Sequence, residues 1–277
     1  MKRLVIGYLH FGERLDDEDR AFIKVAKRKK VDLILFNAFS EISEKELAEK
    51  ANKCDIIFNN SAEGDGIEIS KTIEALGGKV VDSSETFYYP EDKWMFFVKC
   101  KEHNIPTPET ILLPEDIRMA ISEIKKFSKW PVVLKRISGT RGEYVEKADT
   151  SAQAEKIIKK FWKKGGEKLP IIAQEFIPSS AYRVTVIGKE IVQTALKKNY
   201  NWKATGAYTK RNWGFKIDKE LSEMIKKLLK IINIKVCGID FIKKGDKWLV
   251  LEINAQPALD FIGTEREKLI SKVFDLL

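Results

Sequence analysis

The sequence lacks the common signatures of nucleotide-binding proteins. No GxxxxGK[ST] segment occurs in its 277 residues, which excludes a P-loop. The first apolar segment runs into YLHFGERL, whose single glycine is too few for a dinucleotide-binding fingerprint. Histidine is also scarce: neither His10 nor His103 has a serine or cysteine beside it with which to form a catalytic dyad. The residues therefore point away from a reaction through a nucleophilic side chain.

Cysteine and long apolar runs are scarce as well. The three cysteines (Cys54, Cys100 and Cys237) are scattered among apolar neighbours, which indicates reduced thiols in a core rather than disulfides or a metal cluster. No apolar run approaches the length that spans a bilayer. The first ten residues show no signal-peptide pattern. We therefore expect a cytoplasmic protein with no membrane partner.

Charge is plentiful, and the formal net charge is +9. A basic surface suits polyanionic partners such as ATP, acidic substrates or nucleic acid. The basic residues are, however, interleaved with 41 acidic ones in amphipathic stretches such as EMIKKLLK, as on solvated helix faces. No dense basic run or aromatic RNA-binding signature occurs, so nucleic acid is the less favoured partner. The richness in lysine, glutamate and isoleucine is typical of a thermophile.

The pattern of elements predicts an α/β (α+β) fold in three lobes. Residues 1–88 alternate short apolar strands with helices, which predicts a small open sheet with parallel crossovers. Residues 89–180 begin with a helix expected to open at Pro90, pass the stiff connector IPTP, and predict a central lobe. Residues 181–277 are β-rich, with two hairpins, a long amphipathic helix and a last helix, and predict a C-terminal lobe.

The second hairpin, CGIDFIKKGDKWLVLEINAQPAL, carries three oxygen-bearing side chains. Strand alternation places one set of residues of WLVLEIN on the face opposite its leucines: Trp248, Val250, Glu252 and Asn254. Asp240 on the partner strand joins this face if the connecting loop has an odd number of residues, and it would lie diagonally from Glu252, within about 7–8 Å. Two carboxylates and an amide oxygen suit magnesium or manganese. The alternative is that these are ordinary exposed strand charges.

Two lysines occupy unusual settings. Lys135 ends the apolar strand PVVLK, and Lys93 lies in the first turns of the helix before the connector. A lysine that points inward from a strand is costly unless it meets an anion such as a nucleotide phosphate. Each could instead extend its ammonium to solvent. The small loop formed by Gly139, Thr140 and Arg141 after Lys135 suggests a cover for phosphates.

Basic residues also mark the first hairpin. Arg183 lies on one arm, and Lys197 and Lys198 lie on the other. Arg183 would grip phosphate oxygens with two N–H groups, or it would be an exposed hairpin charge.

Five stretches in this order resemble the ATP-grasp superfamily, and within it the branch of the ribosomal-protein glutamate ligase and its archaeal coenzyme glutamate ligase relatives. They are DKWMFFVKCKEHNIPTPET, PVVLKRISGTRGEYV, IIAQEFI, YRVTVIGKEIVQTALKK and VCGIDFIKKGDKWLVLEINAQPAL, and they run from about residue 82 to 262. The resemblance implies the ATP-grasp fold, with ATP held between the central and C-terminal lobes. Such enzymes commonly associate, so a homo-oligomer is implied as well.

The resemblance also implies roles for matching positions. The nucleotide would be held by Lys93, Lys135, the loop Gly139–Arg141, and a strand edge whose backbone binds adenine at Gln174, Glu175, Phe176 and Ile177. The transferred phosphate and acyl phosphate would face Arg183 and Lys198, with Lys197 as the alternative register. Magnesium or manganese would be bound by Asp240, Glu252 and Asn254.

The implied activity is ATP-dependent ligation of a carboxylate to an amine through an acyl phosphate, with release of ADP and phosphate. Relatives add glutamate or another acidic amino acid to a protein tail or a coenzyme, so an acidic acceptor is expected. The alternatives are an ATP-grasp ligase that makes a different small peptide or coenzyme, an inactive nucleotide-binding homologue, and a basic nucleic-acid-binding protein. The residues do not distinguish a small-molecule acceptor from a protein acceptor.

Overall fold

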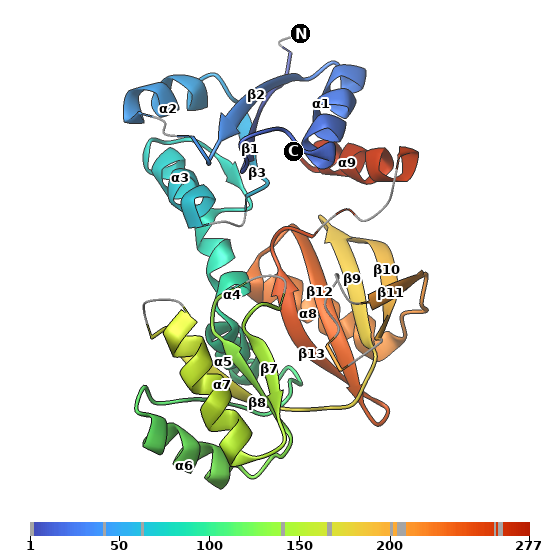
Figure 1. The fold of residues 1–277 in the computed structure, drawn as a ribbon. Helices are drawn as coiled ribbons and strands as arrows, with labels where there is room; N and C mark the ends of the chain where they lie inside the picture. Colours follow the sequence, from blue (N-terminus) through green and yellow to red (C-terminus); the bar gives the residue numbers. More distant parts are fainter. Residues whose placement is uncertain are drawn as a thin grey trace.

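The structure is a computed structural model that describes residues 3–40, 43–61, 64–139, 142–164, 168–199, 202–203, 209–257, 259 and 263–277. Three separate sheets, each with helices packed on it, form three lobes, which confirms the predicted α/β fold (Figure 1). In these ranges no helix combines the length and the apolar character needed to cross a bilayer.

The N-terminal lobe is a parallel sheet with the strand order β2-β1-β3-β4. Its strands are β1 (Val5–His10), β2 (Asp32–Asn37), β3 (Ile56–Asn59) and β4 (Val80–Val81), and its helices are α1 (Asp17–Lys29), α2 (Glu44–Ala51) and α3 (Gly64–Ala75). Helix α1 starts where Asp16 caps it in a capping box with Asp19, and it ends at Lys30 in the left-handed conformation. The predicted parallel lobe is therefore confirmed.

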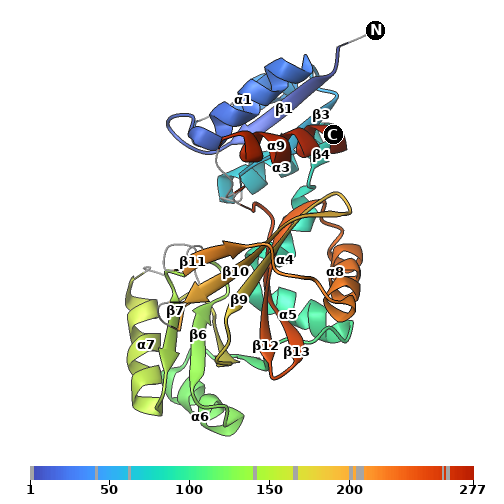
Figure 2. The ribbon, with the colours of Figure 1, turned by 90° about the vertical axis from the view of Figure 1, so that its right-hand side faces the viewer.

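The last helix, α9 (Thr264–Leu276), belongs spatially to this N-terminal lobe (Figures 1 and 2). Its Ile270 and Val273 are buried in one apolar cluster with Phe22 and Val25 of α1. The assignment of all of residues 181–277 to a C-terminal lobe is therefore wrong for this helix. The prediction followed chain order, whereas the apolar face of α9 packs against α1 at the other end of the sequence.

The C-terminal lobe is an antiparallel sheet with the order β11-β10-β9-β12-β13. Its strands are β9 (Ala181–Ile187), β10 (Glu190–Asn199), β11 (Thr209–Trp213), β12 (Val236–Lys244) and β13 (Lys247–Asn254). Two helices cover one face of it, α8 (Lys219–Ile232) and α5 (Lys93–Glu102), and their apolar residues share a core with the sheet. The other face carries charged side chains.

Helix α5 corrects two predictions. It begins at Lys93 and not at Pro90, because Asp92 leaves the helical conformation and caps the backbone N–H groups of Trp94 and Met95 at 2.9 Å each. Pro90 lies in the preceding short helix α4 (Tyr88–Glu91), which follows a turn of 3₁₀ helix, η1 (Ser84–Phe87). In addition, α5 packs on the C-terminal sheet although its residues were assigned to the central lobe, 89–180.

The central lobe is an antiparallel sheet with the order β5-β8-β6-β7, backed by two helices. Its elements are β5 (Thr110–Leu112), α6 (Ile117–Phe127), β6 (Val132–Arg136), β7 (Val145–Ala148), α7 (Ser151–Lys164) and β8 (Ile171–Glu175). Alternate residues of β6 and β8 pack against the helices: Val132, Leu134, Ile171 and Ala173. Lys135, Ile172 and Gln174 face the C-terminal sheet, whereas Arg136 donates to Phe161 O of α7. Figure 2 shows α7 and α8 on the outer sides of the two sheets.

The hairpin of β12 and β13 contains a β-bulge. Its turn, Gly245-Asp246, has two residues, which would pair Asp240 with Leu251. The ladder instead pairs Phe241 with Val250 and Asp240 with Glu252, so Leu251 is the extra residue. The loop is therefore even, so the stated condition is not met, and the bulge supplies the shift that brings Asp240 to this face.

The bulge changes which residues of β13 share a face. Val250 opposes Phe241, and Trp248 lies in the same core as both, on the helix-covered face. Glu252 pairs directly with Asp240, and Asn254 pairs with Gly238. The prediction that Trp248 and Val250 share a face with Glu252 is wrong, whereas the shared face of Asp240, Glu252 and Asn254 is confirmed.

The position of α9 makes a stability prediction. Ile270→Ala should lower the free energy of unfolding by about 2–5 kcal/mol, because Ile270 is fully buried between α9 and the N-terminal sheet. Denaturant unfolding measures it. The matched control is Lys268→Ala, an exposed position on the same helix, where we expect a change within about 0.5 kcal/mol. Equal effects of the two substitutions would contradict the docking of α9.

Candidate active site

A row of charged side chains crosses the open face of the C-terminal sheet. In the strand register, Arg183 of β9 is opposite Asp240 of β12, and Asp240 is opposite Glu252 of β13. Three adjacent strands thus place an arginine and two carboxylates side by side on one face. The sequence predicted each of these residues for the site, and the sheet brings them together.

Asp240 is the centre of this row. Arg183 donates to both of its oxygens, from Nε at 2.6 Å and from an Nη at 2.7 Å, and Lys197 Nζ lies 3.0 and 3.1 Å from the same two atoms. Burial opposes ionisation of Asp240, but the charges and hydrogen bonds of Arg183 and Lys197 outweigh it and hold the pKa of this carboxyl below its ordinary value. Asp240 is therefore ionised and held by two cations.

The two lysines of β10 lie on different faces of the sheet. Lys197 is 4% exposed and reaches Asp240, whereas Lys198 is exposed on the opposite face. The expectation that Lys198 shares the face of Arg183 is therefore wrong, and the alternative, Lys197, lies on that face. Each strand residue turns its side chain opposite to its neighbour, so only the register could decide between them.

Gly238 makes room for the arginine. It lies two residues before Asp240 on the same face of β12, and a Cβ added there would come within 2.6 Å of an Nη of Arg183 and within 3.2 Å of its Cδ and Cζ. The Arg183 side chain thus lies across the bare backbone of Gly238. The sequence analysis did not single out Gly238. The available sign was a glycine within a predicted strand, which often marks a close approach of another group to the backbone.

Glu252 and Asn254 are half-buried beside Asp240. The Nδ2 atom of Asn254 lies 3.4 Å from Gly238 O, which anchors the amide by its nitrogen. Glu252 accepts no hydrogen bond or ion pair from the described part of the chain. Across the same ranges, no three His, Cys, Asp or Glu side chains form a metal cluster. A cation here would therefore rely on two carboxylates, one amide oxygen and ligands from outside the protein.

Lys135 faces this row from the central lobe. It is 7% exposed, and its Nζ donates to Gln174 Oε1 at 2.7 Å. Gln174 in turn donates to Thr110 Oγ1 at 2.9 Å, which fixes the orientation of its amide. Burial lowers the pKa of the Lys135 ammonium to about 8, and the negative charge of Glu252 opposes that shift. The inward position predicted for Lys135 is confirmed, and the solvent-directed alternative is wrong.

Lys93 lies at the start of α5, next to the loop that follows β6. Its Nζ donates to Gly139 O at 2.9 Å, and its backbone N–H donates to Ile137 O at 2.9 Å. Its charge also lowers the pKa of Lys135, so the two ammonium groups are neighbours. Of the predicted loop, Gly139 is thus placed beside Lys93, whereas Thr140 and Arg141 lie outside the described residues.

A pocket lies between the central and C-terminal lobes. It is lined by Lys93, Phe96, Phe97, Thr107, Lys135, Ile172, Gln174, Val250 and Leu251. These residues come from α5, from the connector after it, from β6 and β8, and from the bulge of β13. The pocket therefore joins the two lysines to the hairpin that carries Glu252.

The segment expected to bind adenine needs a correction. Strand β8 is paired on both sides, with β5 and β6, so it is not an edge strand. The backbone N–H of Glu175 donates to Glu109 O at 2.8 Å, and that of Phe176 donates to Pro131 O at 3.2 Å. The Glu175 carboxylate pairs with Lys244 of β12. The chain leaves the sheet only after Glu175 and crosses to the C-terminal lobe through Phe176 and Ile177.

The comparisons with known proteins agree with this geometry. The profile of the RimK-like ATP-grasp domain matches residues 90–274, which span every element of the site. The chain belongs to the RimK-like ATP-grasp family. Members of this ATP-grasp family are carboxylate–amine ligases, and the chain is an enzyme of that class.

Two curated relatives cover most of the chain. The alpha-aminoadipate–LysW ligase LysX of Saccharolobus solfataricus is 31% identical over 207 residues, which are 73% of this chain and 74% of the relative. The probable alpha-L-glutamate ligase of Haemophilus influenzae is 25% identical over 268 residues, 94% of this chain and 87% of the relative.

Solved structures share the ATP-grasp fold over the whole chain. A RimK domain ATP-grasp protein from Sphaerobacter thermophilus has a TM-score of 0.75 at 17% identity and covers 98% of both chains. The D-alanine–D-alanine ligase from Bacillus anthracis, solved with ATP, has a TM-score of 0.73 at 16% identity and covers 99% of this chain and 95% of its own. At such identities the likeness concerns the fold.

From the contact between Gly238 and Arg183 we predict that one substitution has opposite effects on stability in two backgrounds. Gly238→Ala should destabilise the parent by about 1–3 kcal/mol, because the new methyl group overlaps the Arg183 side chain. In the Arg183→Ala background the overlap is absent, and alanine should be neutral or stabilising in a strand. A double-mutant cycle of denaturant unfolding measures the coupling. Additive effects would contradict the position of Arg183 across Gly238.

Proposed function

We propose that this RimK-like ATP-grasp protein uses ATP to join a carboxylate to the amine of glutamate or another amino acid, with an acidic acceptor. The proposal rests on one observation above the others. Lys93 and the buried Lys135 line one pocket together with Val250 and Leu251, next to Glu252 on the hairpin of the C-terminal sheet. Cations on the side of the central lobe and carboxylates of the C-terminal lobe therefore lie near one pocket, an arrangement that suits a triphosphate with its metal.

The chemistry explains why these charges are needed. A carboxylate is a poor acyl donor, because its leaving group would be an oxide ion. Transfer of the terminal phosphoryl group of ATP to a carboxylate oxygen breaks the bond to ADP and gives an acyl phosphate. The amine then attacks the carbonyl carbon, loses a proton, and expels inorganic phosphate. Both steps move negative charge among phosphate oxygens, so fixed cations stabilise them.

The chain supplies these cations from opposite sides of the pocket. Lys135 and Lys93 would bind phosphates from the side of the central lobe, and Gln174 holds the Lys135 ammonium in place. Arg183 and Lys197 would face the transferred phosphoryl group from the C-terminal sheet. In the structure both donate hydrogen bonds to Asp240, whose single negative charge offsets one of their two positive charges, so a phosphate would share cations that the carboxylate already holds.

The residues fit magnesium or manganese. Glu252 offers an ionisable carboxylate without a protein partner among the described residues, Asn254 offers its amide oxygen, and Asp240 is ionised. Oxygen ligands of this kind, together with phosphate oxygens, suit these hard cations. When bound, the metal neutralises phosphate charge. Asp240 would bind it only by sharing oxygens with Arg183 and Lys197.

Adenine is assigned to the apolar part of the pocket. Phe97, Ile172 and Leu251 line it, and the bulge brings Leu251 there. The backbone from Glu175 to Ile177 directly follows Gln174, which lines the pocket, and we assign it to hydrogen bonds with the base. Because Glu175 and Phe176 already donate their N–H groups within the central lobe, the acceptor at Glu175 and the donor at Ile177 are the groups that we assign to adenine.

The substrate class is inferred from the relatives. LysX is named for joining alpha-aminoadipate to LysW, and the Haemophilus protein is named as a glutamate ligase. Both names describe an acidic amino acid. We therefore infer glutamate or a close homologue as the amine, with a coenzyme or a protein tail as the acid. The test is ADP release that depends on magnesium and on one acid–amine pair from a panel; no dependence on any pair would contradict a ligase.

The first prediction here concerns the nucleotide. Lys135→Ala should weaken ATP binding by about 1.5–3 kcal/mol, the range for charge-assisted hydrogen bonds. ATP affinity of the parent should also fall as pH rises through about 8, because the free protein then loses the Lys135 proton. Calorimetry across this range measures both. Lys156→Ala, on the exposed side of α7, is the control. If Lys135→Ala binds ATP as tightly as the parent does, Lys135 does not contact the nucleotide.

The second prediction concerns Glu252. Glu252→Gln keeps the shape of the side chain but removes one negative charge, so turnover should fall by about 10²-fold or more, as for loss of a main electrostatic stabiliser. Without metal the variant should melt no lower than the parent, because the repulsion between two paired carboxylates is relieved. Asp246→Asn in the exposed turn of the same hairpin is the control. Near-parental turnover would show that this strand is not the metal platform.

A further inference from the structure

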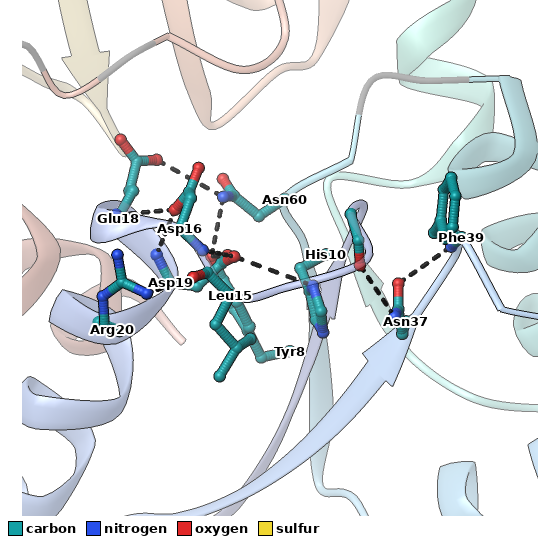
Figure 3. A network of polar contacts seen from close by, with 11 residues as sticks. Tyr8, His10, Leu15, Asp16, Glu18, Asp19, Arg20, Asn37, Phe39 and Asn60 are labelled. Carbon is teal, nitrogen blue, oxygen red and sulfur yellow. Dashed lines mark hydrogen bonds and ion pairs between the residues drawn. The ribbon is translucent and has the colours of Figure 1, made fainter.

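A second polar cluster lies in the N-terminal lobe, outside the site described above. It gathers at the carboxyl ends of β1 and β3 and at the start of α1, and Figure 3 shows its members: Tyr8, His10, Asp16, Glu18, Asp19 and Asn60. The order β2-β1-β3-β4 makes the gap between β1 and β3 the topological switch point of the sheet. In open α/β sheets, ligands bind beside the carboxyl ends of the strands at such a point.

The start of α1 is not equipped for an anion. The N–H groups of Glu18 and Asp19 both donate to Asp16 Oδ1 at 2.8 Å, and the N–H of Asp16 donates to Asp19 Oδ2 at 2.9 Å. The donors with which a helix start binds phosphate are therefore occupied. The side chains around them are acidic, so an anionic ligand would be repelled.

Glu18 is a half-buried carboxylate whose hydrogen bonds are long. Its oxygens lie 3.5 Å from Asn60 Nδ2 and 3.3 Å from the backbone nitrogen of Leu259. The positive charge of Arg266, which donates to Leu259 O at 3.2 Å, also favours the ionised form of Glu18. Burial nevertheless raises the pKa of the Glu18 carboxyl. Because burial still outweighs these groups, a further cation would stabilise the ionised carboxylate.

His10 provides an independent sign of a missing partner. It is 5% exposed, and its Nδ1 atom has no hydrogen bond; the nearest carboxylate oxygen, Asp19 Oδ2, lies 3.9 Å away. Figure 3 shows the ring directed at the carboxylates of α1. Asp19 itself is already satisfied, because Tyr8 Oη donates to it at 2.8 Å. The polar atoms with weak or absent partners are thus the carboxylate oxygens of Glu18 and the Nδ1 atom of His10. A ligand that donates several N–H groups would supply the missing hydrogen bonds.

We propose that Glu18, His10 and Asn60 form a subsite for a primary ammonium group of a substrate. The inference rests on the proposed ligase function for the origin of that group. The chain connects the two sites directly: Leu259, whose N–H approaches Glu18, comes five residues after Asn254 of the candidate metal face. A substrate held at Glu18 would therefore lie along the segment that leaves the reaction centre.

The chemistry also separates two roles of amines. An amine held against a half-buried carboxylate stays protonated and cannot attack a carbonyl carbon. The ammonium at Glu18 is accordingly either the resting state of the amino-acid substrate before it moves to the acyl phosphate, or a separate ammonium group on the acid that is activated. The two sources share one chemistry and differ in which substrate carries it.

The test compares ligands with and without an ammonium group on the full-length protein. Calorimetry uses L-glutamate against N-acetyl-L-glutamate for the amino-acid source, and the dipeptide Glu-Glu against its N-acetyl form for the activated acid. In the parent, at least one free-amine ligand should bind about tenfold or more tightly than its acetylated form. Glu18→Gln should abolish that advantage. Asp17→Asn, the exposed neighbour of equal charge, should keep it.

A thermal melt without ligand separates binding from a structural role. Because burial raises the pKa of Glu18, the ionised carboxylate costs stability at neutral pH, so Glu18→Gln should melt at or above the parent while its ligand advantage is lost. The subsite is overturned if neither free-amine ligand exceeds its acetylated form in the parent, if the advantage survives Glu18→Gln, or if that variant melts lower. ATP binding by the parent is measured in parallel, and its absence would contradict the proposed ligase instead.

Discussion

The buried triad of Arg183, Asp240 and Lys197 is the constraint around which the C-terminal lobe is organised. A carboxylate that is 4% exposed is costly unless it is paired, and here both of its oxygens meet two cations. The geometry depends on the sheet, because the three residues come from three strands whose register must agree. It also depends on the missing side chain of Gly238, across which the guanidinium lies.

The sequence predicted the kinds of elements well, because they follow from local patterns. Alternating apolar strands and capped helices indicated the parallel N-terminal lobe, and β-rich hairpins indicated the C-terminal sheet. Pairing was harder. A two-residue turn and a bulge at Leu251 together give the register that brings Glu252 opposite Asp240, and neither is visible in apolar alternation. For the same reason, Lys197 and Lys198 could not be separated before the register of β10 was known.

Lobe boundaries could not be taken from chain order, since packing partners lie far apart in the sequence. Helix α9 joins α1, and α5 joins the C-terminal sheet. A further contact ties the N-terminal lobe to that sheet: Asp82, just after β4, accepts the N–H groups of Lys235 and Val236 at 2.8 and 3.0 Å. The N-terminal and C-terminal lobes thus share a polar contact, an apolar cluster and the chain segment that leads to α9. Among the described residues, the central sheet and its two helices share no buried apolar cluster with either of the other lobes.

The way in which the central lobe is attached has a mechanical consequence. The chain enters it at Glu109 and leaves it after Glu175, and these two residues are joined by a backbone hydrogen bond of 2.8 Å. Both crossings therefore lie at one place, as in a domain inserted into a loop of its host. A rotation of the central lobe about these two adjacent chain crossings would move Lys135 toward or away from Asp240 and Glu252 without breaking a strand pair in either sheet. Such a rotation would change the width of the pocket and would have to break the hydrogen bonds of Lys93 to Ile137 O and Gly139 O.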